Sequence, residues 1–264
     1  MTKAYAAIFS ARFRTLLQYR AAALAGLACQ FFWGILRIAI FGAFYAISSS
    51  RQPMSLPEVT TYVWLSQAFF RMVPMGADGE VRGLVRSGSV AYELVRPLDL
   101  YSLWFTRSLA ALSSPVILRC VPLLLCAAIF FDLQAPHSFS AALACGAALL
   151  CALLLGAAIQ ALLTISLLWT IAGDGINRVA TVGLYVLSGM VLPLPLYPDW
   201  FQPVLNFLPF RGLIDLPFRL YSGNIPAEQI PWVLAHQLGW TVALVLLGRW
   251  VLSMGTRRLV VQGG

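Results

Sequence analysis

The chain has 264 residues, of which 60% are hydrophobic and only 11% are charged. An average soluble domain carries about 25% charged residues, so this composition excludes a soluble protein and favours one that is solvated by lipid. The net charge of +8 does not indicate nucleic-acid binding, because 17 of the 18 basic residues are arginines scattered between apolar runs and form no basic stripe.

Residues 1–21 predict an amphipathic helix that lies in the cytoplasmic membrane interface. Four apolar side chains share one side at helical spacing, namely Phe9, Phe13, Leu16 and Leu17. Arginines lie mostly on the other side, where they would face anionic lipid head groups. The apolar run that follows this polar helix is too long for a cleavable signal peptide.

Six apolar runs predict six transmembrane helices, since about 20 apolar residues cross the hydrocarbon core as a helix. The runs are 22–47, 58–74, 103–131, 140–170, 179–196 and 232–254. The second run is the weakest, because polar residues dilute it: Thr60, Thr61, Ser66 and Gln67. We expect an all-α integral membrane protein in which residues 1–264 form a single transmembrane permease domain.

The basic residues fix the expected orientation. If the N-terminus is inside, eleven of them fall on the cytoplasmic side: Lys3, Arg12, Arg14, Arg20, Arg82, Arg86, Arg96, Arg107, Arg178, Arg257 and Arg258. Only Arg51, Arg211 and Arg219 fall on the other side. Cytoplasmic loops of membrane proteins are enriched in Lys and Arg, so both termini are expected in the cytoplasm.

The 76–102 segment, between the second and third runs, is the longest charged piece of the chain. It predicts a short helix, a break at Ser87 and Gly88, and an end to any helix at Pro97. Such a helix can dock into a groove on another protein, but the same pattern also fits a solvated loop on the membrane surface. The candidate docking residues are Glu80, Arg82, Arg86, Glu93 and Arg96.

The outer segment, residues 197–231 between the fifth and sixth runs, is rich in proline and aromatic residues. Its prolines prevent one continuous helix, and its hydrophobicity keeps it at the membrane. It predicts short re-entrant helices in the outer leaflet. Irregular backbone at that depth is tolerated where protein buries it or a cavity wets it. The segment therefore either caps a pathway or is a loop without a functional role.

Polar residues inside the first and third runs mark candidate pathway or helix-interface positions: Gln30, Trp33, Arg37 and Arg119. A central arginine costs at least about 2.5–3.5 kcal/mol to insert, so Arg37 and Arg119 should face the protein interior and find partners there. Those partners are either neighbouring helices or a substrate. Arg71 and Arg249 lie near the ends of their runs and can snorkel to the interface.

No catalytic or metal-binding motif is visible. The chain has no GxxxxGK[ST] phosphate loop, no HExxH and no GxSxG, and its two histidines and five cysteines form no ligand pattern. We therefore expect no cofactor bound by this chain. No carboxylate is expected deep in a transmembrane run, which weakens the interpretation as a proton-coupled transporter.

Three stretches resemble a known family: RSGSVAYELVRPLDLY (86–101), LPFRGLIDLPFRLYSG (208–223) and RRLVVQGG (257–264). Together with the order of the predicted elements, they are similar to the permease subunit of ABC-2 type exporters, and more narrowly to viologen- or drug-exporter-type permeases. The resemblance covers essentially the whole chain.

The resemblance implies that the 76–102 segment contains a coupling helix that docks on a separate ATPase. Two ATPase subunits would use ATP and Mg, and a second permease, of the same or a different chain, would pair with this one in a bacterial inner membrane among its lipids. The substrate, hydrophobic or amphipathic (drug, lipid or glycolipid-like), would move outward near the first, second and fifth runs. A cation would be repelled if Arg37 and Arg119 faced that pathway. The alternatives are an ion-coupled secondary transporter and a non-transporting assembly factor.

Overall fold

The computed structural model describes residues 2–18, 20–48, 52–170 and 174–257, and all regular elements within these ranges are helical. Residues 258–264, which carry most of the predicted tail motif, and Arg51 lie outside the described residues. Within these ranges, four stretches are long and apolar enough to cross a membrane: Ala23–Ile47, Leu100–Phe130, Phe139–Thr170 and Ala227–Thr256. They correspond to α2 (Arg20–Ile47), α6 (Leu100–Phe130), α7 with α8 (Phe139–Ile165 and Leu167–Thr170), and η4 with α12 (Ala227–Gln229 and Ile230–Thr256).

Shorter elements complete the chain. The first half contains α1 (Thr2–Leu17), α3 (Leu56–Ala68), η1 (Phe70–Met72), α4 (Gly79–Arg86) and α5 (Ala91–Leu94). The second half contains α9 (Asp174–Leu187), η2 (Leu194–Leu196), α10 (Gln202–Phe207), η3 (Pro209–Gly212) and α11 (Asp215–Ser222).

The second and fifth apolar runs form shorter helices than their hydropathy predicts. α3 has 13 residues and α9 has 14, which give lengths of roughly 20 and 21 Å at 1.5 Å per residue, too short to cross alone. The run from 58 to 74 loses its α-helix after Ala68 and reaches Pro74 through one 3-10 turn. The run from 179 to 196 is interrupted by Gly189, whose φ of 87° suits glycine, and by prolines 193 and 195.

α3 tolerates its polar residues because protein surrounds it. Every residue from Thr61 to Ala68 is buried. Thr61 Oγ1 accepts a hydrogen bond of 3.1 Å from the backbone amide of Gln134, and Ser66 Oγ accepts one of 2.9 Å from Arg37. A helix that contacts other helices on all sides does not need the continuous apolar surface of a lipid-facing span.

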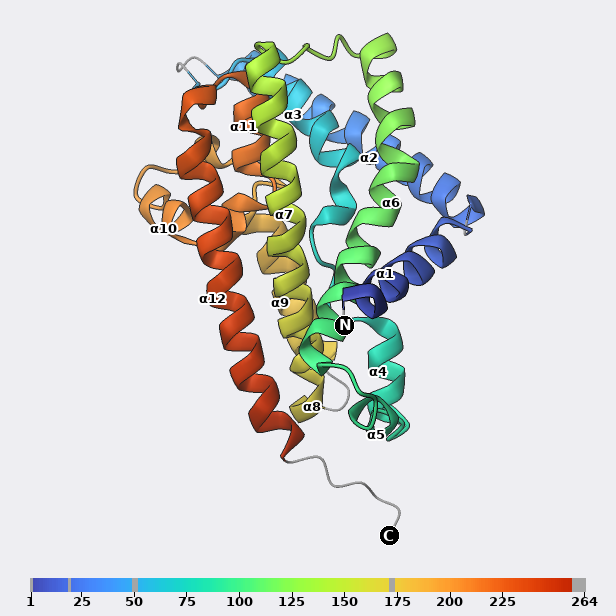
Figure 1. The fold of residues 1–264 in the computed structure, drawn as a ribbon. Helices are drawn as coiled ribbons and strands as arrows, with labels where there is room; N and C mark the ends of the chain where they lie inside the picture. The colour runs from blue at the N-terminus through green and yellow to red at the C-terminus, as the bar shows by residue number, and fades with distance from the viewer. Residues whose placement is uncertain (1, 19, 49–51, 171–173, 258–264) are drawn as a thin grey trace.

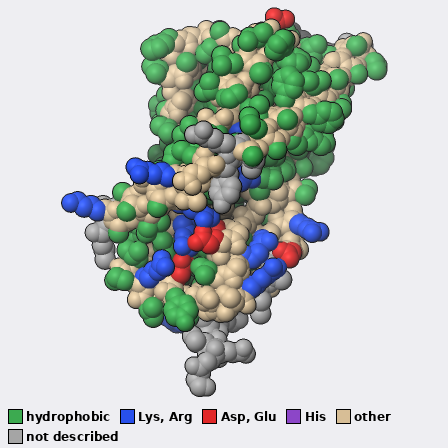
Figure 2. Space-filling view, turned by 90° about the vertical axis from the view of Figure 1, so that its right-hand side faces the viewer, with side chains coloured by type: hydrophobic (Ala, Val, Ile, Leu, Met, Phe, Trp, Pro, Cys, Tyr) green, Lys and Arg blue, Asp and Glu red, His purple; other side chains and the backbone are tan. Residues whose placement is uncertain are grey.

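The helices form an elongated bundle (Figure 1). α12 and α7 run side by side, and α6 diverges from α7 toward the top of Figure 1. α4, α5 and α8 lie at the bottom, below α1. Figure 2 shows Lys and Arg side chains gathered over the lower half of one face and hydrophobic side chains over its upper half.

The N-terminal helix packs onto the bundle. α1 contacts α6, and Ile8 joins the apolar cluster around Val81 and Tyr101. The expectation that Arg12 faces lipid head groups is wrong, because its guanidinium forms ion pairs with Asp78 and Glu80 at the start of α4. The carboxylates of a segment distant in sequence, which the spacing within α1 could not reveal, determine where Arg12 points.

Candidate functional site

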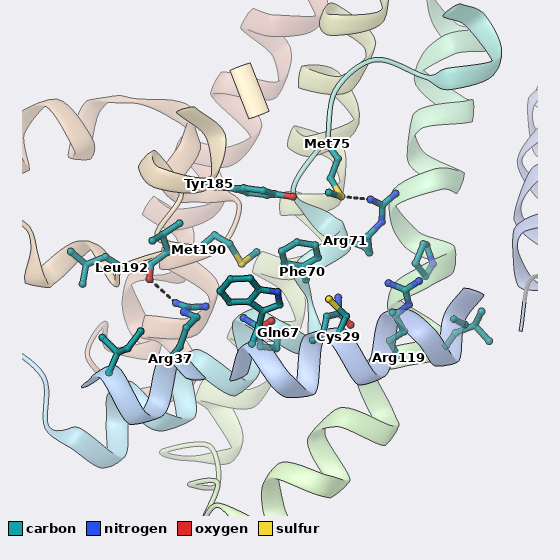
Figure 3. Close-up of a pocket in the computed structure, with 18 of the residues that line it drawn as sticks. Cys29, Arg37, Gln67, Phe70, Arg71, Met75, Arg119, Tyr185, Met190 and Leu192 are labelled. Carbon is teal, nitrogen blue, oxygen red and sulfur yellow. Dashed lines mark hydrogen bonds between the residues drawn. The ribbon is translucent and has the colours of Figure 1, made fainter. Parts of the chain in front are cut away.

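A cavity of about 1020 Å³ opens between α2, η1, α6 and the stretch from α9 to Leu192 (Figure 3). The four pathway or helix-interface candidates from the sequence all line it: Gln30, Trp33, Arg37 and Arg119. Arg71 and Gln67 line it as well, and the rest of the described wall is mostly apolar, including Phe41, Phe70 and Met190. The positions come from segments far apart in the chain, so the fold brings together what the sequence offered only as separate residues.

Arg37 is held at the cavity edge by two hydrogen bonds. Its Nη1 donates to Ser66 Oγ at 2.9 Å, and its Nη2 donates to the backbone carbonyl of Val191 at 2.8 Å. These bonds connect α2 to α3 and to the irregular chain after α9. Of the two kinds of partner expected for Arg37, neighbouring segments of the protein are the ones that the structure shows.

Two glycines let side chains approach α2 closely. A Cβ at Gly26 would collide with the guanidinium of Arg119, and a Cβ at Gly34 would lie 2.7 Å from Trp64 Cζ3. Small residues on a helix face allow such close packing in membranes. Gly26 thus makes room for the Arg119 head in the cavity, while Gly34 seats α2 against α3.

The 76–102 segment folds against the bottom of the bundle, and its acidic residues pair with arginines of α1, α6 and α12. Arg107 on α6 lies 2.7 Å from a carboxylate oxygen of Glu93 and 3.6 Å from one of Glu80. Glu93 is only 3% exposed and also accepts a hydrogen bond of 2.8 Å from Trp104 Nε1. Arg12 of α1 also pairs with Glu80, so α1 and α6 both hold this segment through ion pairs.

The basic residues of α4 connect it to α9. Arg82 Nη1 lies 2.9 Å from Asp174 Oδ1, and Arg86 Nη2 lies 3.2 Å from Asp174 Oδ2. Asp174 is the first residue of α9, the helix that carries the cavity residue Tyr185. These pairs are partly exposed, so each contributes roughly 0.2–1 kcal/mol to stability. Their main effect is to hold α4 in place against the start of α9.

The start of the 76–102 segment is bonded to two deeper helices. The backbone amide of Ala77 donates to Asn177 Oδ1 on α9 at 2.7 Å, and that of Asp78 donates to Thr164 Oγ1 on α7 at 3.0 Å. Asp78 then caps α4 by accepting from the amides of Glu80 and Val81. Sequence reasoning missed Thr164 and Asn177, because a lone polar residue in an apolar run gives no sign of its partner.

The tip of the segment is apolar and exposed. Tyr92, Leu94 and Val95, which we call the apolar tip, surround the end of α5, with Tyr92 74% and Val95 80% exposed. Arg96 beside them is exposed too. Of the five docking candidates from the sequence, Glu80, Arg82, Arg86 and Glu93 thus form ion pairs within the chain, and Arg96 lies at the surface beside the tip.

A capping residue follows the tip. Burial raises the pKa of Asp99, but hydrogen bonds from Ser102 and the positive charge of Arg249 outweigh it, so the pKa lies below its ordinary value. Asp99 therefore stays ionised as the N-cap of α6 and accepts from Ser102 N at 2.9 Å. Arg249, which the sequence placed near the membrane interface, has an ion-pair partner within the chain: its Nη2 lies 3.2 Å from Asp99 Oδ1.

The family model described as ABC-2 family transporter protein matches residues 31–263. The chain belongs to this family. The match covers the cavity wall from Trp33 onward, the 76–102 segment and the outer segment. This ABC-2 protein is therefore a multi-pass membrane permease of an ABC transporter, and the family implies an ATPase subunit as its partner. No curated protein matches the chain.

In the ABC-2 permease the outer segment contains a buried charge cluster. Asp215, whose side chain is fully buried, lies 3.9 Å from Arg211 and 3.7 Å from Arg219. Gln237 on α12 donates to the carbonyls of Gly212 and Ala148, which fixes the segment between α12 and α7. The sequence analysis concerned carboxylates inside the apolar runs, and it missed this buried carboxylate of the outer segment, with which an arginine one helical turn away on either side pairs.

Proposed function

We propose that this permease exports a hydrophobic or amphipathic substrate, driven by two copies of a separate ATPase that uses ATP and Mg. The supporting observation is mechanical continuity: the apolar tip at one end is bonded, through the 76–102 segment, to helices that line the cavity. A tip that moves with an ATPase would move the cavity walls with it.

Two routes carry this motion. The first route is the ion pair between Glu93 of the segment and Arg107 of α6, the helix that also carries the cavity residues Arg119 and Pro115. The second route is the ion pair between Arg82 of the segment and Asp174 at the start of α9, the helix that carries the cavity residue Tyr185. The ion pairs therefore act as transmitting contacts, and the apolar tip with Arg96 acts as the docking surface for the ATPase.

The proposed topology has six crossings, with both termini in the cytoplasm of a bacterial inner membrane. α3 with η1 and the extended chain to Asp78 would complete one short crossing, since α3 lies toward the top of Figure 1 and α4 at the bottom. α9 with the chain to Leu196 would complete the other. The bottom of Figure 1, where α4 and α5 lie, is then the cytoplasmic end.

A second permease, the same or a different chain, completes the proposed transporter. α2 supports this pairing, because it presents a row of exposed large apolar residues: Leu24, Phe32, Ile35, Leu36, Ile40, Phe44 and Ile47. Membrane helices associate by packing, and a face of this length fits another helix as well as it fits lipid. The cavity beside α2 would then open toward the partner permease.

Capture of the ATPase tests the docking surface. The permease, co-expressed with its ATPase subunit and purified in mild detergent, should retain the ATPase, while Val95→Asp combined with Tyr92→Ala should lose it and still insert. Trp200→Ala removes an equally exposed aromatic from the outer segment and should keep the ATPase. Undiminished ATPase retention by the tip variant would contradict the proposal.

Energy dependence separates the rival functions. In proteoliposomes, transport should require ATP and persist with a protonophore. Transport that continues without ATP and collapses with a protonophore would indicate an ion-coupled carrier. ATPase activity that no substrate stimulates would indicate an assembly factor.

A further inference from the structure

We propose that the cavity binds an amphiphile with an anionic head group, and that this head group lies between Arg71 and Arg119 at the cytoplasmic end of the cavity. The inference rests on the proposed transport role and adds the chemical class of the substrate. Its first basis is charge: three arginines line the cavity, and none of its described lining residues is acidic.

The positions of the arginines define a polarity. Figure 3 shows the Arg71 and Arg119 side chains at the same end of the cavity, with Arg37 at the other end near Leu192. Arg71 follows α3 on the way to the 76–102 segment, and Arg119 faces Gly26 in the first turns of α2, so their end is the one nearer α4. Two guanidiniums at one end can share a phosphate, sulfate or carboxylate through charge-assisted hydrogen bonds.

Electrostatic energy favours occupation by an anion. Charged groups in a poorly hydrated wall lose much of their solvation, and the repulsion between two of them is stronger than in water. A bound anion removes both costs. A cation would add to the repulsion, so a viologen-type dication is a poor fit to this wall.

The wall between the two ends suits an apolar chain. Trp33, Phe41, Phe70 and Met190 are among its lining residues, and Phe70 lies between Arg37 and Arg71 in Figure 3. Gly26 and Arg37 are eleven residues apart on α2, roughly 16 Å at 1.5 Å per residue. An apolar tail attached to a head group at Arg71 and Arg119 would extend along this wall toward Arg37.

Gln30 supplies an independent sign of a ligand. It lines the cavity, is only 5% exposed, and its side-chain oxygen has no hydrogen-bond partner among the described residues. A buried acceptor left unpaired costs about 1–3 kcal/mol, which a donor on the ligand would recover. The amphiphile therefore carries a hydroxyl or amide near its head group.

Direct binding tests the proposal without ATP or the ATPase. The full-length permease is placed in phosphatidylcholine nanodiscs and titrated with a chain-brominated alkyl phosphate, with binding read from quenching of tryptophan fluorescence. A brominated alkyltrimethylammonium of equal length is the cationic probe, and inorganic phosphate is the competitor. Trp33→Phe should remove most of the quenching, which locates the probe in the cavity.

The phosphate probe should bind at least about tenfold more tightly than the cationic probe. Arg71→Gln and Arg119→Gln should each weaken it about tenfold, the usual effect of losing one charged hydrogen bond. Arg249→Gln makes the same charge change outside the cavity and should bind normally. Gly26→Ala keeps every arginine but displaces the Arg119 guanidinium, and should weaken the phosphate probe alone.

Three results would overturn the proposal. Equal affinity for the two probes would mean that charge does not select the ligand. Inorganic phosphate that competes as well as the amphiphile would indicate a free-anion site. Unchanged quenching in Trp33→Phe would place the probe elsewhere, for example in a groove that a second permease normally fills. None of these results affects ATPase capture, so the substrate class can fail while the proposed function stands.

Discussion

The backbone amide of Asp78 donates a hydrogen bond of 3.0 Å to Thr164 Oγ1, across 86 positions of the chain. The Thr164 hydroxyl donates in turn to the carbonyl of Gln160 on its own helix at 2.8 Å. This one side chain therefore fixes the residue that caps α4 to the last turn of α7. Any movement of the apolar tip relative to α7 has to break or carry this bond.

Thr164→Val should weaken both stability and coupling. Valine has the same shape but leaves the buried amide of Asp78 without an acceptor, at a cost of about 1–3 kcal/mol. The expected result is a lower thermal unfolding midpoint and reduced substrate-stimulated ATPase activity of the reconstituted transporter. Thr181→Val is the matched control, because its described hydroxyl bond goes only to its own helix at Asn177. Equal effects of the two variants would show that the Asp78 bond has no special role.

Asp174→Arg should uncouple the ATPase from transport without unfolding the permease. The change places a cation opposite Arg82 and Arg86, but the pairs are partly exposed, so little stability is lost. Adding Arg82→Glu and Arg86→Glu should restore transport in proteoliposomes, since the pairs re-form with reversed charges. Asp199→Arg in the outer segment is the control. Absence of rescue in the triple variant would mean that Asp174 acts through another contact.

Glu93→Gln should destabilise the permease by on the order of 3 kcal/mol, because Arg107 keeps its charge in a nearly buried site and loses its nearest carboxylate. The amide can still accept from Trp104, so the effect reports the ion pair. Unfolding in detergent, followed by intrinsic fluorescence, measures the loss. The exposed Glu228→Gln should leave unfolding unchanged. A Glu93→Gln midpoint equal to that of the unsubstituted chain would contradict the role of the pair.

Gly34→Leu should separate α2 from α3. Its side chain would occupy the space of the buried Trp64 ring, and overpacking of this kind costs about 1–3 kcal/mol. Gly42→Leu adds the same side chain to the same helix where nothing lies within 4 Å, so it should be neutral. Crosslinking between cysteines introduced on α2 and α3 gives the direct measurement, and equal crosslinking in the two variants would count against the packing.

The sequence predicted the class of the protein and much of the cavity, but not the contacts that connect them. Arg37 and Arg119 stood out because charge is rare in apolar runs, and the cost of lipid exposure implied an inward orientation. Arg71 was expected at the interface, because its position near the end of a run said nothing of the cavity beside it. Asp174, Thr164 and Asn177 were missed, since each acts through a partner far away in sequence.

Helix lengths also could not be predicted from the sequence, because they depend on contacts with distant segments. Hydropathy measures how apolar a stretch is, and it cannot say whether lipid or protein will surround it. The run at 58–74 contains the helix α3, and its polar residues looked like a defect of a span until their partners at Gln134 and Arg37 became visible. The docking role expected of Glu80, Arg82 and Arg86 now stands as a proposal of transmission, because all three form ion pairs within the chain.

The burial of α3 also has a consequence for biogenesis. As it leaves the ribosome, this helix is too short and too polar to partition into lipid by itself, and the α6 and α11 residues that will surround it have not yet been made. Its entry into the bilayer must therefore follow synthesis of later helices, and α2 has to wait beside it without a partner. Late assembly of α3 leaves time in which quality-control proteases can remove any variant that slows the insertion of α6 or α11.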